Sequence, residues 1–169
     1  NEYIKSKTLF DYNYAYTDVT NEKNIQYMLM NLKNISNKQK IIFINDKNIE
    51  NLQNIRFETI AIDSEINNTK QLKKLISNVR YLILNADIEK YKDILEELNL
   101  MVVTYGFKSK ATITVSSVSE NNVIICLQRI MNTAQNGKYE PQEMNIKVNQ
   151  DIDIHGIICT HIIRLFYEK

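Results

Sequence analysis

Hydrophobic residues in the first 107 positions form short continuous runs that alternate with longer amphipathic stretches. The short runs are typical of strands, and they cover 14–19, 40–45, 57–62, 81–84 and 101–105. The stretches between them repeat apolar residues three or four positions apart, which predicts helices with one buried face. Their stripes are Ile25, Met28, Leu29, Leu32 and Ile35; Leu72, Leu75, Ile76 and Val79; and Ile88, Tyr91, Ile94, Leu95 and Leu98. This alternation favours a parallel sheet with right-handed crossovers.

The pattern changes after Gly106. Apolar and polar residues alternate over 111–118, and a turn at 120–122 leads to a further strand at 123–127. Asn136-Gly137 is typical of a hairpin turn, and the strand that follows it alternates again through Met144, Ile146 and Val148. We therefore expect an antiparallel meander over 108–150. The last segment, 151–169, predicts a helix with one apolar face: Ile154, Ile157, Ile158, His161, Ile162, Leu165 and Phe166.

These elements together predict a single α/β domain. The expected architecture is a three-layer, Rossmann-like, mostly parallel sheet (1–107) with an antiparallel extension (108–150) and a C-terminal helix (151–169). The chain has 169 residues, of which 44% are hydrophobic, and this is enough for one sizeable core. We find no linker, repeat or low-complexity segment that would divide it.

Glycine is scarce, and its scarcity excludes several kinds of site. The chain has three glycines, and the two nearest each other, Gly137 and Gly156, are 19 positions apart (156 − 137 = 19). A Walker phosphate loop, a dinucleotide-binding fingerprint and a hydrolase nucleophile elbow each need closely spaced glycines. None of these motifs is present, and no catalytic residue is predicted.

Charge and cysteine content indicate which partners and which cellular compartment to expect. With 21 basic and 20 acidic residues the net charge is +1, so we expect no nucleic-acid partner. No apolar run approaches the length of a membrane span, and no secretory signal is present. Cys126 and Cys159 lie among apolar residues, as reduced core thiols do. We therefore expect a cytoplasmic protein without a membrane partner.

Aspartates follow four of the predicted strands. They are Asp18, Asp46, Asp63 and Asp87, and the carboxyl ends of parallel strands meet at the edge where ligands bind. Carboxylates gathered there could hold Mg²⁺ or raise one another's pKa. They could equally cap and turn the loops that follow the strands. Both interpretations remain open, and the polar residues expected near this edge are Asn45, Asn85 and Thr104.

The two histidines do not predict a metal site. His155 and Cys159 are four positions apart and could share a helix face, as zinc ligands do. Two ligands alone make a poor zinc site, however, and His161 falls in the apolar stripe, where a structural role is expected. We predict no metal ligand and no cofactor.

Three short segments occur in an order that resembles a known family. They are Asn85-Ala86-Asp87 after a strand, Thr104-Tyr105-Gly106-Phe107 at the end of the next strand, and Asp153-Ile154-His155-Gly156 at the entry to the last helix. This order is similar to that of the second half of the central, ATP-binding domain of Mur ligases, the amino-acid-adding enzymes of peptidoglycan synthesis. The resemblance covers roughly residues 80 to 165, and in it His155 matches the family histidine.

The departures from the family are as informative as the matches. Gly156 and Cys159 stand where the family has two asparagines that help to hold the adenine side of ATP. The segment after the first strand keeps Thr20 and Lys23 but has no glycine with which to wrap a phosphate. A chain of 169 residues also leaves no room for the family's other two domains. The resemblance therefore implies a shortened core domain without ligase chemistry, for which ATP and Mg²⁺ are not expected as cofactors.

The function that follows is a non-catalytic, Mur-ligase-like binding or regulatory domain in bacterial cell-envelope or peptidoglycan metabolism. The alternative is a small metal-assisted nucleotide-binding protein or enzyme that uses the acidic strand-end edge. The partner would be a small molecule or a protein, or a second copy of the chain paired through an exposed strand edge. The candidate ligand-binding residues are Asp18, Thr20, Asn45, Asp46, Asp63, Asn85, Asp87, Thr104 and His155.

Overall fold

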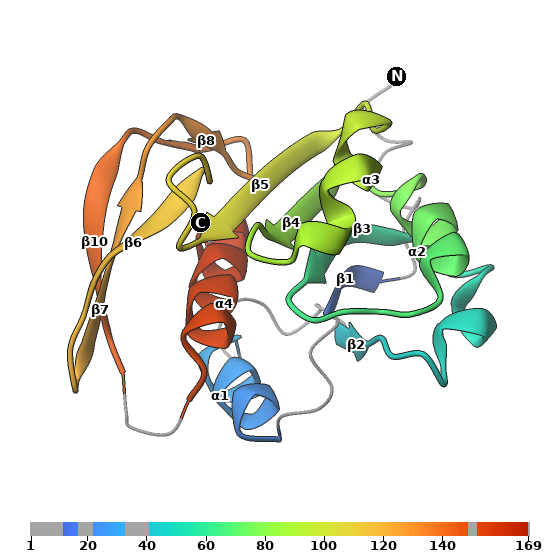
Figure 1. Cartoon of the computed structure of the whole chain (residues 1–169), viewed down its shortest axis with the longest axis horizontal. Coiled ribbons are helices and arrows are strands. Elements are labelled where there is room, and N and C mark those ends of the chain that lie inside the picture. Colours follow the sequence, from blue (N-terminus) through green and yellow to red (C-terminus); the bar gives the residue numbers. More distant parts are fainter. Residues whose placement is uncertain (1–11, 17–21, 33–40, 149–151, 169) are drawn as a thin grey trace.

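The computed structural model describes residues 12–16, 22–32, 41–148 and 152–168, and its centre is an eight-stranded sheet (Figure 1). In spatial order its strands are β10 (Gln142–Lys147), β7 (Asn122–Leu127), β6 (Ile113–Val118), β5 (Met101–Gly106), β4 (Tyr81–Asn85), β3 (Phe57–Ile62), β1 (Tyr12–Tyr16) and β2 (Ile41–Phe43). Neighbours from β2 to β6 are parallel, and β6, β7 and β10 pair antiparallel. The prediction of a mostly parallel sheet with an antiparallel extension is confirmed.

Helices cover both faces of the sheet, which gives the predicted three layers. One face carries α1 (Glu22–Leu32) and α4 (Ile154–Tyr167), and the other carries η2 (Ile49–Leu52), α2 (Thr69–Ile76), η3 (Glu89–Tyr91) and α3 (Lys92–Glu96). Successive side chains of a strand point to opposite faces. In β4, Ile83 therefore packs with α4, while Leu82 and Leu84 pack with the helices of the other face.

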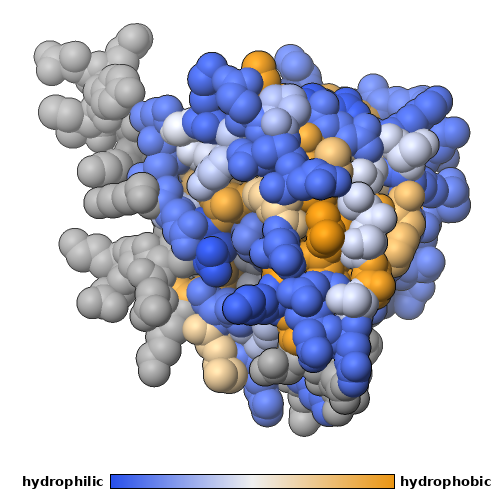
Figure 2. Space-filling model, turned by 90° about the vertical axis from the view of Figure 1, so that its left-hand side faces the viewer, coloured by the Kyte–Doolittle hydropathy of each residue, from blue (hydrophilic) through white to orange (hydrophobic). Residues whose placement is uncertain are grey.

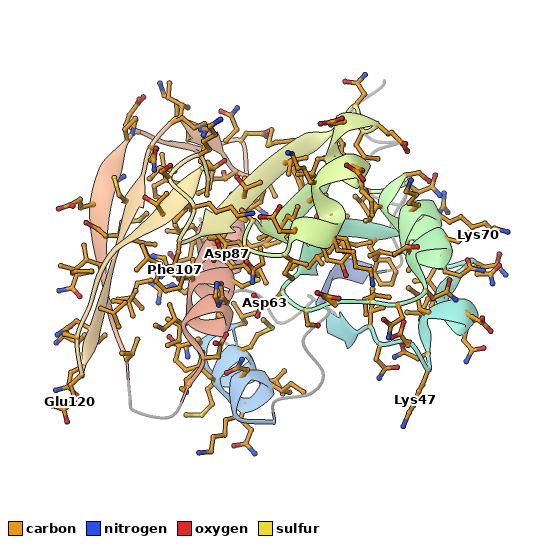
Figure 3. All side chains as sticks on the ribbon, viewed as in Figure 1. Lys47, Asp63, Lys70, Asp87, Phe107 and Glu120 are labelled. Carbon is orange, nitrogen blue, oxygen red and sulfur yellow. The ribbon has the colours of Figure 1, made fainter. Side chains whose placement is uncertain are left out.

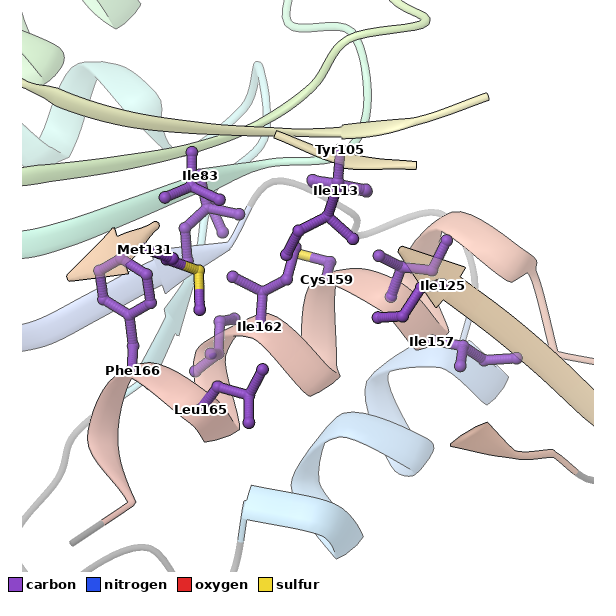
Figure 4. Close-up of a cluster of buried hydrophobic side chains, with 14 of the residues drawn as sticks. Ile83, Tyr105, Ile113, Ile125, Met131, Ile157, Cys159, Ile162, Leu165 and Phe166 are labelled. Carbon is purple, nitrogen blue, oxygen red and sulfur yellow. The ribbon is translucent and has the colours of Figure 1, made fainter. Parts of the chain in front are cut away.

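The helix α4 is buried on nearly all sides. Figure 4 shows its apolar residues packed beneath the sheet, and Phe166 also meets the Tyr81 ring edge-on at 5.4 Å between ring centres. Ile158, Cys159, Ile162, Ile163 and Phe166 are each 0% exposed. A helix that is apolar all round needs partners all round. They come from the parallel strands, from α1 and from the antiparallel extension, which contributes Val123, Ile125, Leu127 and Ile146.

β6 joins the parallel strands to the antiparallel extension. β6 pairs parallel with β5, through Tyr105 with Ile113 and Gly106 with Thr114. Between the two strands, Thr112 N–H donates to Thr104 Oγ1 at 3.0 Å, and Ala111 N–H donates to Lys108 O. These bonds fold 107–112 into a compact loop that returns the chain to its original direction. Within 108–150, β6, β7 and β10 pair antiparallel as predicted.

Other element predictions hold with local corrections. The turn at Asn136-Gly137 joins β8 (Met131–Asn132) to β9 (Lys138–Tyr139), and Asn136 has a φ of 61°. The helix expected over 88–98 is instead a 3₁₀ turn, η3, followed by the short α3. Leu29 is 47% exposed, not on the buried face, because α1 packs through Asn24, Met28 and Leu32, four residues apart. The predicted positions 17–19, Thr20 and Ile35 lie outside the described residues.

The antiparallel extension presents a mostly polar face to solvent. The side of the molecule that carries β7 and β10 presents mostly hydrophilic residues, with hydrophobic ones visible between them (Figure 2). Among the described residues, no helix is both long and apolar enough to cross a membrane.

Gly156 sets the distance between α1 and α4 and gives a test of this packing. A Cβ added at Gly156 would lie 2.6 Å from Asn24 Nδ2 and 2.9 Å from Asn24 Cγ, and Asn24 is 2% exposed. We expect Gly156→Ala to lower the free energy of unfolding by about 1–3 kcal/mol in urea titrations, because a packed interface resists an added methyl group.

Asn24→Ala provides the matched background for that test. It removes both crowded atoms, although it also removes the carboxamide oxygen that accepts Asp153 N–H at 3.2 Å. In this background Gly156→Ala should be neutral or stabilising by up to about 1 kcal/mol, the helix preference of alanine over glycine. An equal cost in both backgrounds would contradict this account of the packing.

Candidate functional site

The carboxyl ends of β3, β4 and β5 meet the start of α4 at one edge of the sheet. This is the edge at which ligands bind in open parallel sheets. In Figure 3, Asp63, Asp87 and Phe107 lie near one another, around α4. We call the group formed by Asp63, Asn85, Asp87, Tyr105, Phe107 and His155 the strand-end site.

Asp87 lies at the centre of the strand-end site. One carboxylate oxygen accepts His155 Nε2–H at 2.7 Å and Phe107 N–H at 2.9 Å, and the other accepts Lys108 N–H at 3.3 Å. The loop that carries Asp87 is fixed by its own backbone, since Asp87 N–H donates to Asn85 Oδ1 at 3.0 Å. One carboxylate therefore joins three segments that lie far apart in the sequence.

Gly106 makes room for that carboxylate. Its φ is +141°, a conformation that residues with a side chain rarely adopt, and a Cβ there would lie 2.5 Å from Asp87 Oδ2. Glycine is therefore required at this strand end both by backbone conformation and by the close approach of Asp87.

His155 is held as a cation. Asp153 and Asp87 raise the pKa of His155 to about 9 against the opposing effect of burial, and the Asp153 contribution is the larger. The distances show that Asp87 makes the direct hydrogen bond, while Asp153 Oδ2 is 3.9 Å from Nδ1 and acts through its charge. Asp153 is also the N-cap of α4, since its side chain accepts Gly156 N–H at 3.1 Å.

The two aspartates respond in the opposite direction. Burial works to raise the pKa of Asp87, but the hydrogen bonds from His155 and Phe107 outweigh it and leave that pKa below its usual value. The contact with His155 likewise lowers the pKa of Asp153. All three groups are therefore ionised at neutral pH, and they form a compact ion cluster around the start of α4.

Behind this cluster lies a buried polar network. Tyr105 is 0% exposed and donates its hydroxyl to Asp63 Oδ1. Asn85, 4% exposed, donates to Asp63 O and Asp63 Oδ1, each at 3.4 Å. Buried polar groups that satisfy one another in this way rigidify the strand ends.

Other predicted residues of this edge serve loop structure. Asp46 accepts Asn67 N–H at 2.8 Å and Asn68 N–H at 2.9 Å, and Asn45 Oδ1 accepts Asn48 N–H at 2.9 Å. For these two positions the loop-capping interpretation holds. β1 lies between their strand, β2, and β3 in the sheet, so they are apart from the strand-end site.

The structure thus sorts the nine predicted positions. It brings together Asp63, Asn85, Asp87 and His155, and it separates Asn45, Asp46 and Thr104, the last of which pairs with Thr112. Asp18 and Thr20 lie outside the described residues.

Three further residues of this region were not predicted as site residues. They are Tyr105, Phe107 and Asp153. Their signals were present, because Tyr105 and Phe107 belong to the Tyr-Gly-Phe motif and Asp153 is a helix-capping residue type immediately before an apolar helix.

The site offers few free carboxylate oxygens for a cation. Both oxygens of Asp87 already accept hydrogen bonds from the protein, and within the described residues no group of three His, Cys, Asp or Glu side chains is placed to hold a metal ion. Cys159 lies in the core, so it does not join His155 as a ligand pair.

What the site presents to solvent is the ring of Phe107. This ring is 53% exposed and meets the His155 ring edge-on at 5.5 Å between ring centres. Lys108, beside it, is paired with Glu89. An aromatic surface supported by a cation is therefore the accessible feature of this edge.

Comparison of the sequence with descriptions of known protein families finds no match, and no curated protein matches it either.

The ion cluster predicts a specific dependence of stability on pH. A histidine with a raised pKa in the folded state stabilises fully below its unfolded value of about 6.5, and this contribution disappears as the pH rises through about 9. The shift sets an upper limit of roughly 3 kcal/mol. Since His155 and Asp87 are 23% and 24% exposed, screening should reduce the effect to about 1–2 kcal/mol.

His155→Gln is the appropriate reference, because glutamine can donate to Asp87 but does not titrate. The difference in free energy of unfolding between wild type and this variant should shrink by that amount between about pH 6 and about pH 10. NMR titration of the His155 ring provides the direct check. A difference that stays constant over this range, with a ring pKa near 6.5, would contradict the ion cluster.

Proposed function

We propose that this chain is a non-catalytic, Mur-ligase-like binding or regulatory domain that works in the cytoplasm, in bacterial cell-envelope or peptidoglycan metabolism. The observation that carries the proposal is the meeting of the three segments on which the resemblance rests. The Asn-x-Asp loop, the Tyr-Gly-Phe strand end and the helix entry converge on Asp87 through Asp87, Phe107 and His155. The three segments, which are separate in the sequence, thus lie together in the folded chain.

The residues at the helix entry support a non-catalytic role. Where the family has asparagines near the adenine, Gly156 packs against Asn24 and Cys159 is 0% exposed in the core. Neither position offers an amide group to a nucleotide. The carboxylate oxygens of Asp87, which contacts the helix entry through His155, already accept hydrogen bonds from protein donors. These features support recognition of a ligand by shape and charge, without a phosphate-transfer step.

The accessible surface indicates how a ligand would bind. The exposed Phe107 ring can stack on a planar group. The positive charge of His155 beneath it is offset by Asp87 and Asp153, so stacking is the main contact that this surface offers. A planar ring, such as the uracil of a UDP-sugar precursor of peptidoglycan, fits this surface. Both Asp87 oxygens already accept hydrogen bonds from the protein, so we expect ligand binding that does not depend on Mg²⁺.

The proposal can be tested by calorimetry and thermal shift with ATP, ADP and UDP-sugar precursors, each with and without Mg²⁺. We expect binding of a UDP-sugar precursor that is insensitive to Mg²⁺, and no ATP hydrolysis above the blank. Phe107→Ala should weaken this binding about tenfold at unchanged melting temperature, because it removes an exposed stacking surface.

Asp46→Asn serves as the control, since it changes a carboxylate of the same edge that only braces a loop. Binding of MgATP that is lost in Asp87→Asn but kept in Asp46→Asn would overturn the proposal in favour of a metal-assisted nucleotide-binding protein. Absence of binding by every compound tested would refute the small-molecule ligand class proposed here.

A further inference from the structure

A polar hollow lies where α1, α4 and β10 meet, away from the strand-end site. It encloses about 190 Å³ and is lined by Tyr27, Asn31, Asn145, Ile146, Lys147, Thr160, His161 and Arg164. Sites for drug-sized ligands are larger, roughly 300–1,000 Å³. The hollow therefore suits a molecule of only a few heavy atoms.

His161 lines this hollow and carries an unused hydrogen-bonding group just beneath its surface. Its Nε2 is buried and, among the described residues, has no hydrogen-bond partner. Burial, and secondarily the charge of Arg164, lowers the pKa of His161 to about 4, so the ring is neutral at physiological pH. A buried polar atom without a partner costs about 1–3 kcal/mol, and such atoms in native proteins usually have a ligand, an ion or water as partner.

Two positively charged side chains from different elements line the hollow. Arg164 belongs to α4 and Lys147 to β10. Arg164 forms an ion pair with Glu168, with 2.8 Å between Nε and a carboxylate oxygen, but the buried Nε makes no hydrogen bond among the described residues. Asn31 and Asn145 add amide groups to the same lining. Its two positive charges, against the one carboxylate of Glu168, favour an anionic ligand.

We infer that this hollow binds a small oxyanion, a carboxylate or a phosphate group, held by Arg164 and Lys147. A hydroxyl group of the same molecule hydrogen-bonds to His161 Nε2, which a small turn of the ring brings to the hollow. The planar guanidinium fork matches either oxyanion in two-point contact. The neutral ring can accept from or donate to the hydroxyl, depending on its tautomer. This site is separate from the strand-end site, since none of the residues that line the hollow belongs to that site.

Calorimetry at fixed ionic strength tests the inference with two sets of probes. Inorganic phosphate and glycerol 3-phosphate form one set, and succinate and malate form the other. Whichever oxyanion binds identifies the source. Malate should bind more tightly than succinate, or glycerol 3-phosphate more tightly than phosphate, because each carries the hydroxyl that His161 can meet. Binding should also shift the NMR signals of the His161 ring.

Variants on the lining sharpen this test. We expect Arg164→Gln to weaken binding at least tenfold, and His161→Phe to abolish the preference for the hydroxylated probe. If Arg164→Gln folds poorly, Lys147→Gln can replace it in the test, because Lys147 is an exposed side chain of β10. Arg129→Gln is the control, because Arg129 is an exposed arginine that donates to Lys110 O away from the hollow.

Two outcomes would overturn the inference. One is the absence of binding by both probe sets at millimolar concentration, and the other is binding that Arg164→Gln and Arg129→Gln weaken equally, as general charge attraction would require. Phe107→Ala should leave oxyanion binding unchanged. Failure of the UDP-sugar experiment at the strand-end site therefore does not decide the result at this one.

Discussion

The carboxylate of Asp87 is the contact on which the arrangement of the strand ends depends. It binds the turn after β5 through two backbone N–H groups and the start of α4 through His155, 68 residues further along the chain. Apolar packing along α4 is extensive but not directional, so it cannot by itself fix where the helix begins. The charged hydrogen bond supplies that direction, and Gly106 provides the space in which it forms.

The antiparallel extension has a physical reason that follows from α4. Because this helix is apolar on nearly all sides, a sheet on one face and α1 on another would leave part of it in water. β7 and β10 carry the sheet past the parallel strands and add Ile125 and Ile146 to the same core. At the other end, the hydroxyl of Tyr167 hydrogen-bonds with Thr59 of β3. The helix is thus fixed by polar contacts at both ends and by apolar contacts between them.

Hydrophobic periodicity was sufficient to predict the elements, the parallel sheet, its antiparallel extension and the final helix. It left open how β6 pairs with β5, because the parallel pairing depends on how Thr104 and Thr112 bond across a six-residue loop. It also placed Leu29 on the wrong side of α1, since a stripe of apolar residues does not reveal which of its edges meets α4.

For the candidate site the limit was the spatial order of the strands. Acids after strands were predicted to share one edge, and Asp63 and Asp87 do approach the same helix entry. Asp46 lies on the far side of β1 and braces a loop, which no spacing along the chain could reveal. The two histidines of α4 show the same limit of sequence-based prediction. The sequence indicated only that His161 has a structural role. Burial beside Arg164 keeps that ring neutral and unpaired, whereas two carboxylates hold His155 charged and engaged. A ligand at the strand-end site must therefore use the exposed rim around Phe107, because its inner polar groups already bond one another. A ligand at His161 would complete a hydrogen bond that the described residues leave unmade, and could come and go without breaking any contact that positions the helix.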